Sequence, residues 1–270
     1  MLTTLTPVLL ATLRFIIASI IFTPIIFIES RRGSNLNAGD LKELALLGFL
    51  SISVYFWLQY TGVKHAGAGV SALLVVGLIP ILTGFASTIV LGERLTAHKA
   101  LGTALGLLGV ALIALPGLLI GEIDWLFYLG VVCLLLNGVC WAAYSTLSRR
   151  LMKRFGRPAL VTSYVTVLGT MALVPMSVAS DWALVRSLGP LQWISVLYLA
   201  IVCSGLGYLL WNFALSRLEA VKAAVWLYLE PVAAFIGEMA IFGAMPSSTT
   251  LTGGLIIFLG AYITNRAGDQ

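Results

Sequence analysis

Two acidic side chains, Glu230 and Glu238, lie deep inside apolar stretches of the sequence. A charge at the centre of a bilayer costs at least about 2.5–3.5 kcal/mol, so such residues usually face a cavity or a partner. Glu230 directly precedes Pro231, and Glu238 follows on roughly the same helix face. Both are candidates for carrying a proton, and Glu230 also for binding a cationic substrate group. The alternative is a neutral, hydrogen-bonded carboxyl group that holds helices together.

Arg14 is a basic residue within an apolar stretch, about a third of the way in from the predicted outer end. At that depth a long cationic side chain can extend back to the membrane surface. We therefore consider two roles for Arg14. It binds substrate or anchors helices, or it is a structural cation that reaches the surface.

Pro80 and Pro231 each lie near the middle of an apolar stretch. A proline inside a helix cannot bond the carbonyl four residues back, here that of Val76 or Leu227. Such carbonyls are tolerated at membrane depth where protein or a wet cavity satisfies them. The two prolines therefore indicate a substrate site near the bilayer midplane, with a purely structural kink as the alternative.

Three helix faces combine aromatic with small polar residues, because their members are three or four positions apart. They are Ser53, Trp57 and Tyr60; Ser204, Tyr208 and Trp211; and Asn137, Trp141 and Tyr144. We expect these faces to line a substrate cavity. Packing between helices or an aromatic belt at the membrane surface is the alternative.

The sequence has neither a catalytic nor a metal-binding motif that we recognise. Cys133, Cys140 and Cys203 lie in apolar runs, and His65 and His98 lie in loops predicted on opposite sides. Nucleophile-elbow, zinc-protease and Walker patterns are missing. We therefore expect no catalytic residues, no metal and no cofactor.

The composition excludes most classes of soluble protein. Of the 270 residues, 60% are hydrophobic and 10% are charged, against about 45–50% and about 25% in soluble domains, and the mean hydropathy is +1.02. A soluble enzyme, a disordered chain and a nucleic-acid binder are excluded on this basis. The chain is predicted to be an all-α, polytopic bundle in a lipid bilayer.

Nine apolar runs are long enough to cross a hydrocarbon core of about 30 Å. They cover residues 7–28, 41–62, 69–91, 97–115, 125–147, 158–179, 191–214, 221–242 and 249–265. Short loops join them. When the loops are assigned to alternate sides, 13 of the 16 Lys and Arg residues fall on one side, and Lys64 and Arg186 on the other. By the positive-inside rule, Met1 is outside and Gln270 is cytoplasmic.

The sequence resembles itself when it is shifted by 151 residues without a gap. Matches include Pro7 with Pro158, Pro24 with Pro175, Pro80 with Pro231, Ser53 with Ser204, and Gly102 and Gly109 with Gly253 and Gly260. We divide the chain into a first copy, 1–119, with four helices and a second copy, 120–270, with five. The first helix of copy one is then missing. A five-helix repeat inverts the orientation of its second copy, as in secondary transporters.

Several short motifs resemble those of EamA-type transporters, of the drug/metabolite transporter superfamily. They are Pro7 with Leu13-Arg14-Phe15; Pro80-Ile-Leu-Thr-Gly84, Leu91-Gly-Glu-Arg-Leu-Thr96 and Gly102; Asn137, Trp141-Ala-Ala-Tyr144 and Leu147-Ser-Arg-Arg150; and Glu230-Pro-Val-Ala-Ala234 with Gly243. The resemblance covers almost the whole chain. It implies a ten-helix (five plus five) inner-membrane carrier with a central cavity that exports small metabolites, amino acids or drugs. This sequence departs from the family in lacking the first helix and in having Ala244 after Gly243.

Three classes of function remain. The first is a secondary carrier of a small molecule in a bacterial inner membrane, by alternating access. The second is a non-transporting or helix-deficient scaffold, and the third, an intramembrane enzyme, lacks a visible constellation of catalytic side chains. We expect a small-molecule substrate and a lipid bilayer as partners and no nucleic acid; a monomer fits the sequence, which does not reveal the oligomeric state.

The charge distribution makes a prediction about topology. A cysteine introduced at Ser247 is expected to react with a membrane-impermeant maleimide added outside intact cells, and one at His98 only after the inner side is opened. The measurement is maleimide labelling in a background without Cys133, Cys140 and Cys203. Labelling of Ser247→Cys from the cytoplasmic side only would contradict the predicted orientation.

Overall fold

The computed structural model describes residues 5–31, 33, 36–118, 124–243 and 247–266. Within these ranges helices are joined by short loops and no strand is present, so the predicted all-α class is confirmed. The elements are α1 (Pro7–Arg31), α2 (Ala38–Gly48), η1 (Phe49–Val54), α3 (Tyr55–Ser71), η2 (Ala72–Val76), α4 (Gly77–Leu91), α5 (Ala97–Leu118), α6 (Trp125–Phe155), α7 (Pro158–Met176), η3 (Trp182–Ser187), α8 (Pro190–Tyr198), η4 (Leu199–Gly207), α9 (Tyr208–Arg217), α10 (Ala220–Ala224), η5 (Val225–Leu229), α11 (Glu230–Phe242) and α12 (Ser248–Arg266).

Eight helical stretches in the described residues are long and apolar enough to cross a membrane. The sequence analysis expected nine. The ninth, α12, is helical over 19 residues, but its four threonines, Asn265 and Arg266 dilute its apolar character. The helix α6 also extends to Phe155, through residues that the sequence analysis assigned to a loop. Arg, Lys, Leu and Met favour a helix there, and Gly156, with φ of +64°, follows its end.

The chain forms two compact units. Unit 1 contains Met1–Tyr60 and Leu147–Arg217, and unit 2 contains Thr61–Thr146 and Leu218–Gln270. Each unit therefore takes helices from both proposed copies of the repeat. The chain passes between the units within α3, within α6 and at the joint between α9 and α10.

Unit 1 is built around α1 and α7, which run antiparallel. Thr6 hydrogen bonds to Ser180 at one end, Ser19 bonds to Thr170 in the middle, and Glu29 pairs with Arg157 at the other end. Ser19 and Thr170 are 151 positions apart. The first and last contacts exchange under the same shift, because Thr6 corresponds to Arg157 and Glu29 to Ser180. Contacts that exchange in this way indicate a local two-fold axis.

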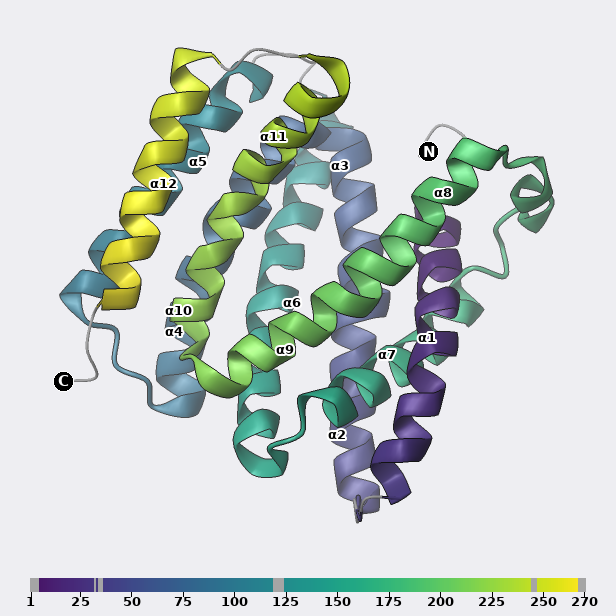
Figure 1. The fold of residues 1–270 in the computed structure, drawn as a ribbon. Coiled ribbons are helices and arrows are strands. Elements are labelled where there is room, and N and C mark those ends of the chain that lie inside the picture. The colour runs from purple at the N-terminus through teal and green to yellow at the C-terminus, as the bar shows by residue number, and fades with distance from the viewer. Residues whose placement is uncertain (1–4, 32, 34–35, 119–123, 244–246, 267–270) are drawn as a thin grey trace. The chain divides into compact units, whose positions relative to one another are not determined.

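Unit 2 contains a similar pair, α5 and α12, which lie side by side (Figure 1). A Cβ atom at Gly102 would lie 2.5 Å from the Gly260 carbonyl oxygen, and one at Gly109 would lie 2.6 Å from that of Gly253. These two contacts also exchange under a shift of 151. Only glycine allows so close an approach of two backbones, and small residues drive helix association in membranes.

Three segments of the helices have π-helical hydrogen bonding: η1, η2 and η4. The segment η1 in unit 1 maps onto η4 of the same unit under the shift of 151. Such irregular segments occur at membrane depth where protein or a water-filled cavity satisfies the backbone. They are frequent at functional sites.

The glycine seam of unit 2 generates a prediction about stability. The substitution Gly109→Leu is expected to separate α5 from α12 and to lower the free energy of unfolding by about 1–3 kcal/mol, the usual cost of overpacking. A thermal unfolding scan of the purified protein measures this. The control is Gly237→Ala in α11, where an added Cβ meets no atom within 4 Å. Equal unfolding temperatures for both variants would contradict the close seam.

Candidate functional site

Unit 1 holds a buried polar cluster centred on Arg14 of α1. Its Nε donates a hydrogen bond to Ser204 Oγ at 2.7 Å, and its Nη1 donates to Tyr60 Oη at 3.0 Å. The guanidinium carbon lies 4.7 Å from the ring centroid of Phe56. The side chain is 6% exposed. Two other helical segments, η4 and α3, therefore hold this cation in one orientation.

The position of Ser204 bears on the two roles considered for Arg14. Ser204 belongs to η4, midway along the membrane-crossing stretch Pro190–Arg217. The Arg14 side chain therefore ends among helix side chains, with Ser204 on one nitrogen and Tyr60 on another. Substrate binding by Arg14 remains a prediction.

Hydroxyl groups elsewhere in unit 1 donate to backbone carbonyls. Tyr208, which is 4% exposed, donates to the carbonyl of Ser51 in η1 at 3.1 Å. Ser53 donates to the carbonyl of Gly169 at 3.0 Å. The predicted faces thus contribute to one polar interior in unit 1. Trp57 lies outside it with 43% of its surface exposed, and Trp211 is half-buried.

Unit 2 contains a cavity of about 230 Å³ that is lined by Glu230 and Pro231. The other lining residues are Val63, Ser71, Ala72, Val76 and Ala234. Val76 is the residue whose carbonyl Pro80 cannot bond, although Pro80 itself is buried and does not line the cavity. The carboxyl group of Glu230 and the hydroxyl of Ser71 are the hydrogen-bonding side chains of this lining.

A second cavity, of about 450 Å³, lies between α11 and α12. Apart from Thr250, its lining is apolar. Because a polar metabolite needs groups that fix its orientation, the cavity at Glu230 is the better candidate in unit 2. The side chain of Glu238 lies outside the described residues.

The third predicted face lies on α6 in unit 2. Asn137 and Tyr144 are fully buried, and the Trp141 ring lies 5.3 Å from the Tyr144 ring. Trp141 packs against a cluster that includes Leu134, Ile79 and Leu227. These contacts show the packing role, and substrate binding by this face remains a prediction.

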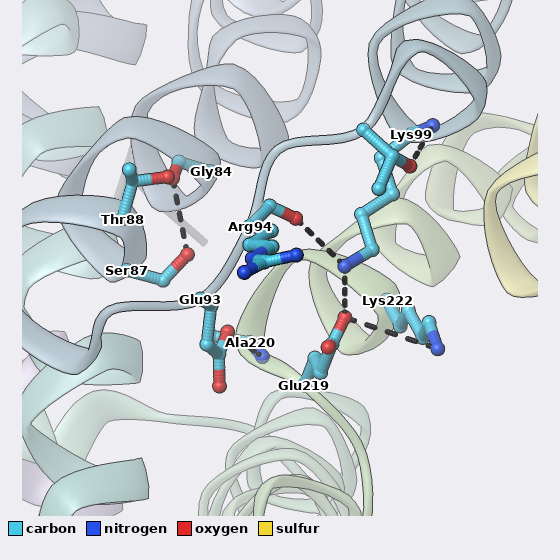
Figure 2. Close-up of polar contacts among 10 residues, drawn as sticks. Gly84, Ser87, Thr88, Glu93, Arg94, Lys99, Glu219, Ala220 and Lys222 are labelled. Atoms are coloured by element: carbon cyan, nitrogen blue, oxygen red, sulfur yellow. Dashed lines mark hydrogen bonds and ion pairs between the residues drawn. The ribbon is translucent and has the colours of Figure 1, made fainter. Parts of the chain in front are cut away.

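The sequence analysis missed a group of charges in unit 2, which Figure 2 shows. Glu93, in the short loop between α4 and α5, accepts a hydrogen bond from the backbone N–H of Ala220 at 3.0 Å. Lys99 lies 2.5 Å from Glu219 and donates to the carbonyl of Arg94 at 2.8 Å. Lys222 approaches Glu219 to 3.8 Å. We call Glu93, Lys99, Glu219 and Lys222 the charged clamp.

The charged clamp joins the α4–α5 loop to the first turn of α10, more than a hundred residues later. The Lys99 side chain is only 2% exposed, so its charge depends on Glu219 for compensation. Gly92, with φ of +67°, turns the chain out of α4 and brings Glu93 into place. The Gly92-Glu93-Arg94 motif is visible in the sequence. Residue spacing does not show that this loop contacts the first turn of α10, because the two segments are far apart in the chain.

The sequence matches the pattern of the EamA-like transporter family over residues 1–115 and 128–266. An "Uncharacterized transporter" of Archaeoglobus fulgidus is 31% identical over 97% of this chain and 90% of its own length. A "Probable terminal-alkyne amino-acid exporter" of Streptantibioticus cattleyicolor is 29% identical over 85% of this chain and 74% of its own length. A crystal structure with 22% identity covers 95% of this chain and 86% of its own, with a TM-score of 0.78, and shares the fold.

The charged clamp yields a prediction from its buried pair. Lys99→Met leaves Glu219 with a weaker partner and is expected to cost about 2–4 kcal/mol of stability, somewhat less than breaking a fully buried pair, because the Glu219 side chain is 18% exposed. The double variant Lys99→Met/Glu219→Gln removes both charges and should recover more than half of that loss. Chemical unfolding of all variants, as a double-mutant cycle, measures the coupling. Additive losses would show that the two side chains do not stabilise each other.

Proposed function

The chain belongs to the EamA-like transporter family, and we propose that it is a secondary transporter that exports small metabolites, amino acids or drugs by alternating access. It is a multi-pass membrane protein with eight apolar spans in its described residues. We place it in a bacterial inner membrane, with Met1 outside and Gln270 in the cytoplasm. The distribution of Lys and Arg supports this orientation.

One observation carries the proposal beyond the family name: contacts exchange between the two halves of the chain. Gly102–Gly260 pairs with Gly109–Gly253 in unit 2, and Thr6–Ser180 pairs with Glu29–Arg157 in unit 1. In both units the paired helices are antiparallel. A two-fold axis that relates antiparallel membrane helices lies in the membrane plane, and this supports residues 1–119 and 120–270 as inverted repeats.

Inverted repeats matter for function because they give a chain two arrangements of nearly equal energy. In secondary transporters the substrate site lies near the midplane, where helices are broken, and the repeats open it alternately to each side. The π-helical segments η1 and η4 and the proline-containing stretches at Pro80 and Pro231 are such breaks. We propose that the substrate contacts the residues around these breaks.

The proposed substrate-binding residues come from both units. They are Arg14, Trp57, Tyr60, Tyr208 and Trp211 in unit 1, and Pro80, Asn137, Trp141, Tyr144, Glu230 and Pro231 in unit 2. The name of the relative that exports an amino acid supports a small polar substrate. Glu230 has the exposure and the cavity that a proton-carrying carboxyl group needs, with Glu238 as the other candidate.

Proton coupling through Glu230 makes a prediction about uphill transport. In proteoliposomes with a pH difference of one unit, one-for-one exchange with protons supports up to about tenfold accumulation of a labelled amino acid. Glu230→Gln keeps shape and hydrogen bonding but cannot titrate. It is therefore expected to exchange substrate at equal concentrations and to accumulate none.

The matched control for that experiment is Glu230→Asp, which keeps a titratable carboxyl group and should retain accumulation. Transport against the gradient by Glu230→Gln at the level of the unmodified protein would rule out Glu230 as the proton carrier. The pH dependence of the exchange rate provides a second measurement, since it should disappear with the carboxyl group.

A further inference from the structure

The positive charge of Arg14 has no carboxylate partner within its own unit. Unit 1 contains four acidic residues, all of them described, and each is engaged at a helix end. Glu29 pairs with Arg157, Asp40 and Glu43 pair with Arg154, and Asp181 accepts a hydrogen bond from the Ala183 backbone. The groups that contact Arg14 are instead neutral: two hydroxyls and two aromatic rings.

Neutral contacts compensate a buried cation only in part. Stacking on an aromatic ring contributes about 0.5–2 kcal/mol, and each hydrogen bond to a charged group about 1.5–3 kcal/mol. Removing an ion from water costs several kcal/mol even after relaxation. Arg14 is 6% exposed and bonded to Ser204 at mid-span. The unit therefore maintains an unneutralised charge at membrane depth.

The internal symmetry shows that packing alone does not require this charge. The residue that corresponds to Arg14 in the second half of the chain is Val165, which is completely buried. Ser53, which corresponds to Ser204, is satisfied by the Gly169 carbonyl. The same place in the other half is thus filled by an apolar side chain and a serine–backbone bond. The corresponding place in the other half therefore packs without a charge.

The geometry leaves hydrogen-bond donors of the cluster available. The guanidinium group has five N–H groups, of which two are used, by Ser204 and Tyr60. Nη2 takes part in none of the described hydrogen bonds. Tyr60 Oη accepts from Arg14, so its own O–H proton is left to donate, and Tyr60 is half-buried. Phe56 stacks on the guanidinium plane and fixes its direction.

We propose that Arg14 and Tyr60 bind the carboxylate group of the transported molecule, which makes small carboxylic acids, amino acids among them, the substrate class. The inference rests on the proposed transport function and specifies the chemistry of its site. A planar guanidinium binds a carboxylate through two parallel hydrogen bonds, and the Tyr60 hydroxyl supplies a third donor. The bound carboxylate neutralises the charge that unit 1 leaves unpaired.

The test uses the full chain in lipid nanodiscs and measures thermal stabilisation by added compounds. The probes are the eighteen amino acids other than aspartate and glutamate and, for each, the corresponding amide, which has nearly the same size but no carboxylate. We expect at least one amino acid to raise the unfolding temperature and its amide to have no effect. Arg14→Gln should weaken that binding at least tenfold. The affinity of Arg14→Lys should lie between those of the unmodified protein and Arg14→Gln, since lysine keeps the charge but lacks the two parallel N–H donors of the guanidinium group.

Two further variants separate binding from folding. Tyr60→Phe keeps the ring and the arginine, so it should fold, with an unfolding temperature lowered by the loss of one hydrogen bond to Arg14, and bind the same amino acid several-fold more weakly. Arg186→Gln removes an exposed arginine of unit 1 and should bind like the unmodified protein. If Arg14→Gln does not fold, Tyr60→Phe and the amide comparison decide the question.

Three results would overturn the inference. The first is equal stabilisation by an amino acid and its amide, and the second is no response to any amino acid. The third is an unchanged affinity in Arg14→Gln or, if that variant does not fold, in Tyr60→Phe. Transport in proteoliposomes distinguishes this failure from failure of the proposed function. Uphill transport of a compound without a carboxylate would leave the transporter standing and remove the carboxylate site. Binding that depends on a carboxylate, in a protein that transports none of these compounds, would support the carboxylate site and contradict the proposed transport function.

Discussion

Every backbone N–H and C=O group at membrane depth needs a partner within the protein, and the rest of this structure depends on that constraint. Regular helices satisfy it internally, which is why the eight apolar spans of the described chain are helical. Where the helices become irregular, side chains take over. Tyr208 donates to Ser51 in unit 1, and Tyr228 bonds to the carbonyls of Gly77 and Thr103 in unit 2. These buried tyrosines stabilise the broken segments that a transport site requires.

Charge is distributed by the same constraint. Most described ion pairs lie near helix ends, as Glu29 with Arg157 and Lys99 with Glu219 do. Two charged side chains depart from this pattern, Arg14 in unit 1 and Glu230 in unit 2. Intramembrane ionisable residues are expensive, so they mark candidate functional positions. Both lie next to an irregular helix segment, since Arg14 is bonded to Ser204 of η4 and Glu230 directly follows η5.

Comparison of corresponding positions in the two halves of the chain distinguishes residues that both halves share from residues that only one half has. Glycine contacts that exchange between α5 and α12 serve the fold equally in both halves. Arg14 corresponds to Val165, and Glu93 corresponds to Ala244. The polar residues that break the symmetry are therefore the ones whose roles must be specific to one half. Arg14 lies at membrane depth, and Glu93 holds the first turn of α10 at a helix end.

The sequence by itself determined the class, the spans and the family. Apolar runs and short loops predict a helical membrane bundle because lipid allows few other structures. The error concerns local context, since α6 continues through basic residues that favour a helix. The predicted ninth stretch, α12, is helical as expected, although it is not among the eight apolar spans of the described residues. Spacing placed Ser53, Trp57 and Tyr60 on one face. The packing of neighbouring helices left Trp57 exposed and bonded Tyr60 to Arg14.

Only the tertiary structure decided which side chains meet across long sequence separations. Arg14 with Ser204, Glu93 with Ala220 and Lys99 with Glu219 are contacts between distant segments, and no periodicity within one helix encodes them. The structure also divided the chain into two units that do not follow its sequence halves. The physical reason is that hydrophobic patterns place a helix in the membrane, whereas hydrogen bonds and close packing between helices choose its neighbours.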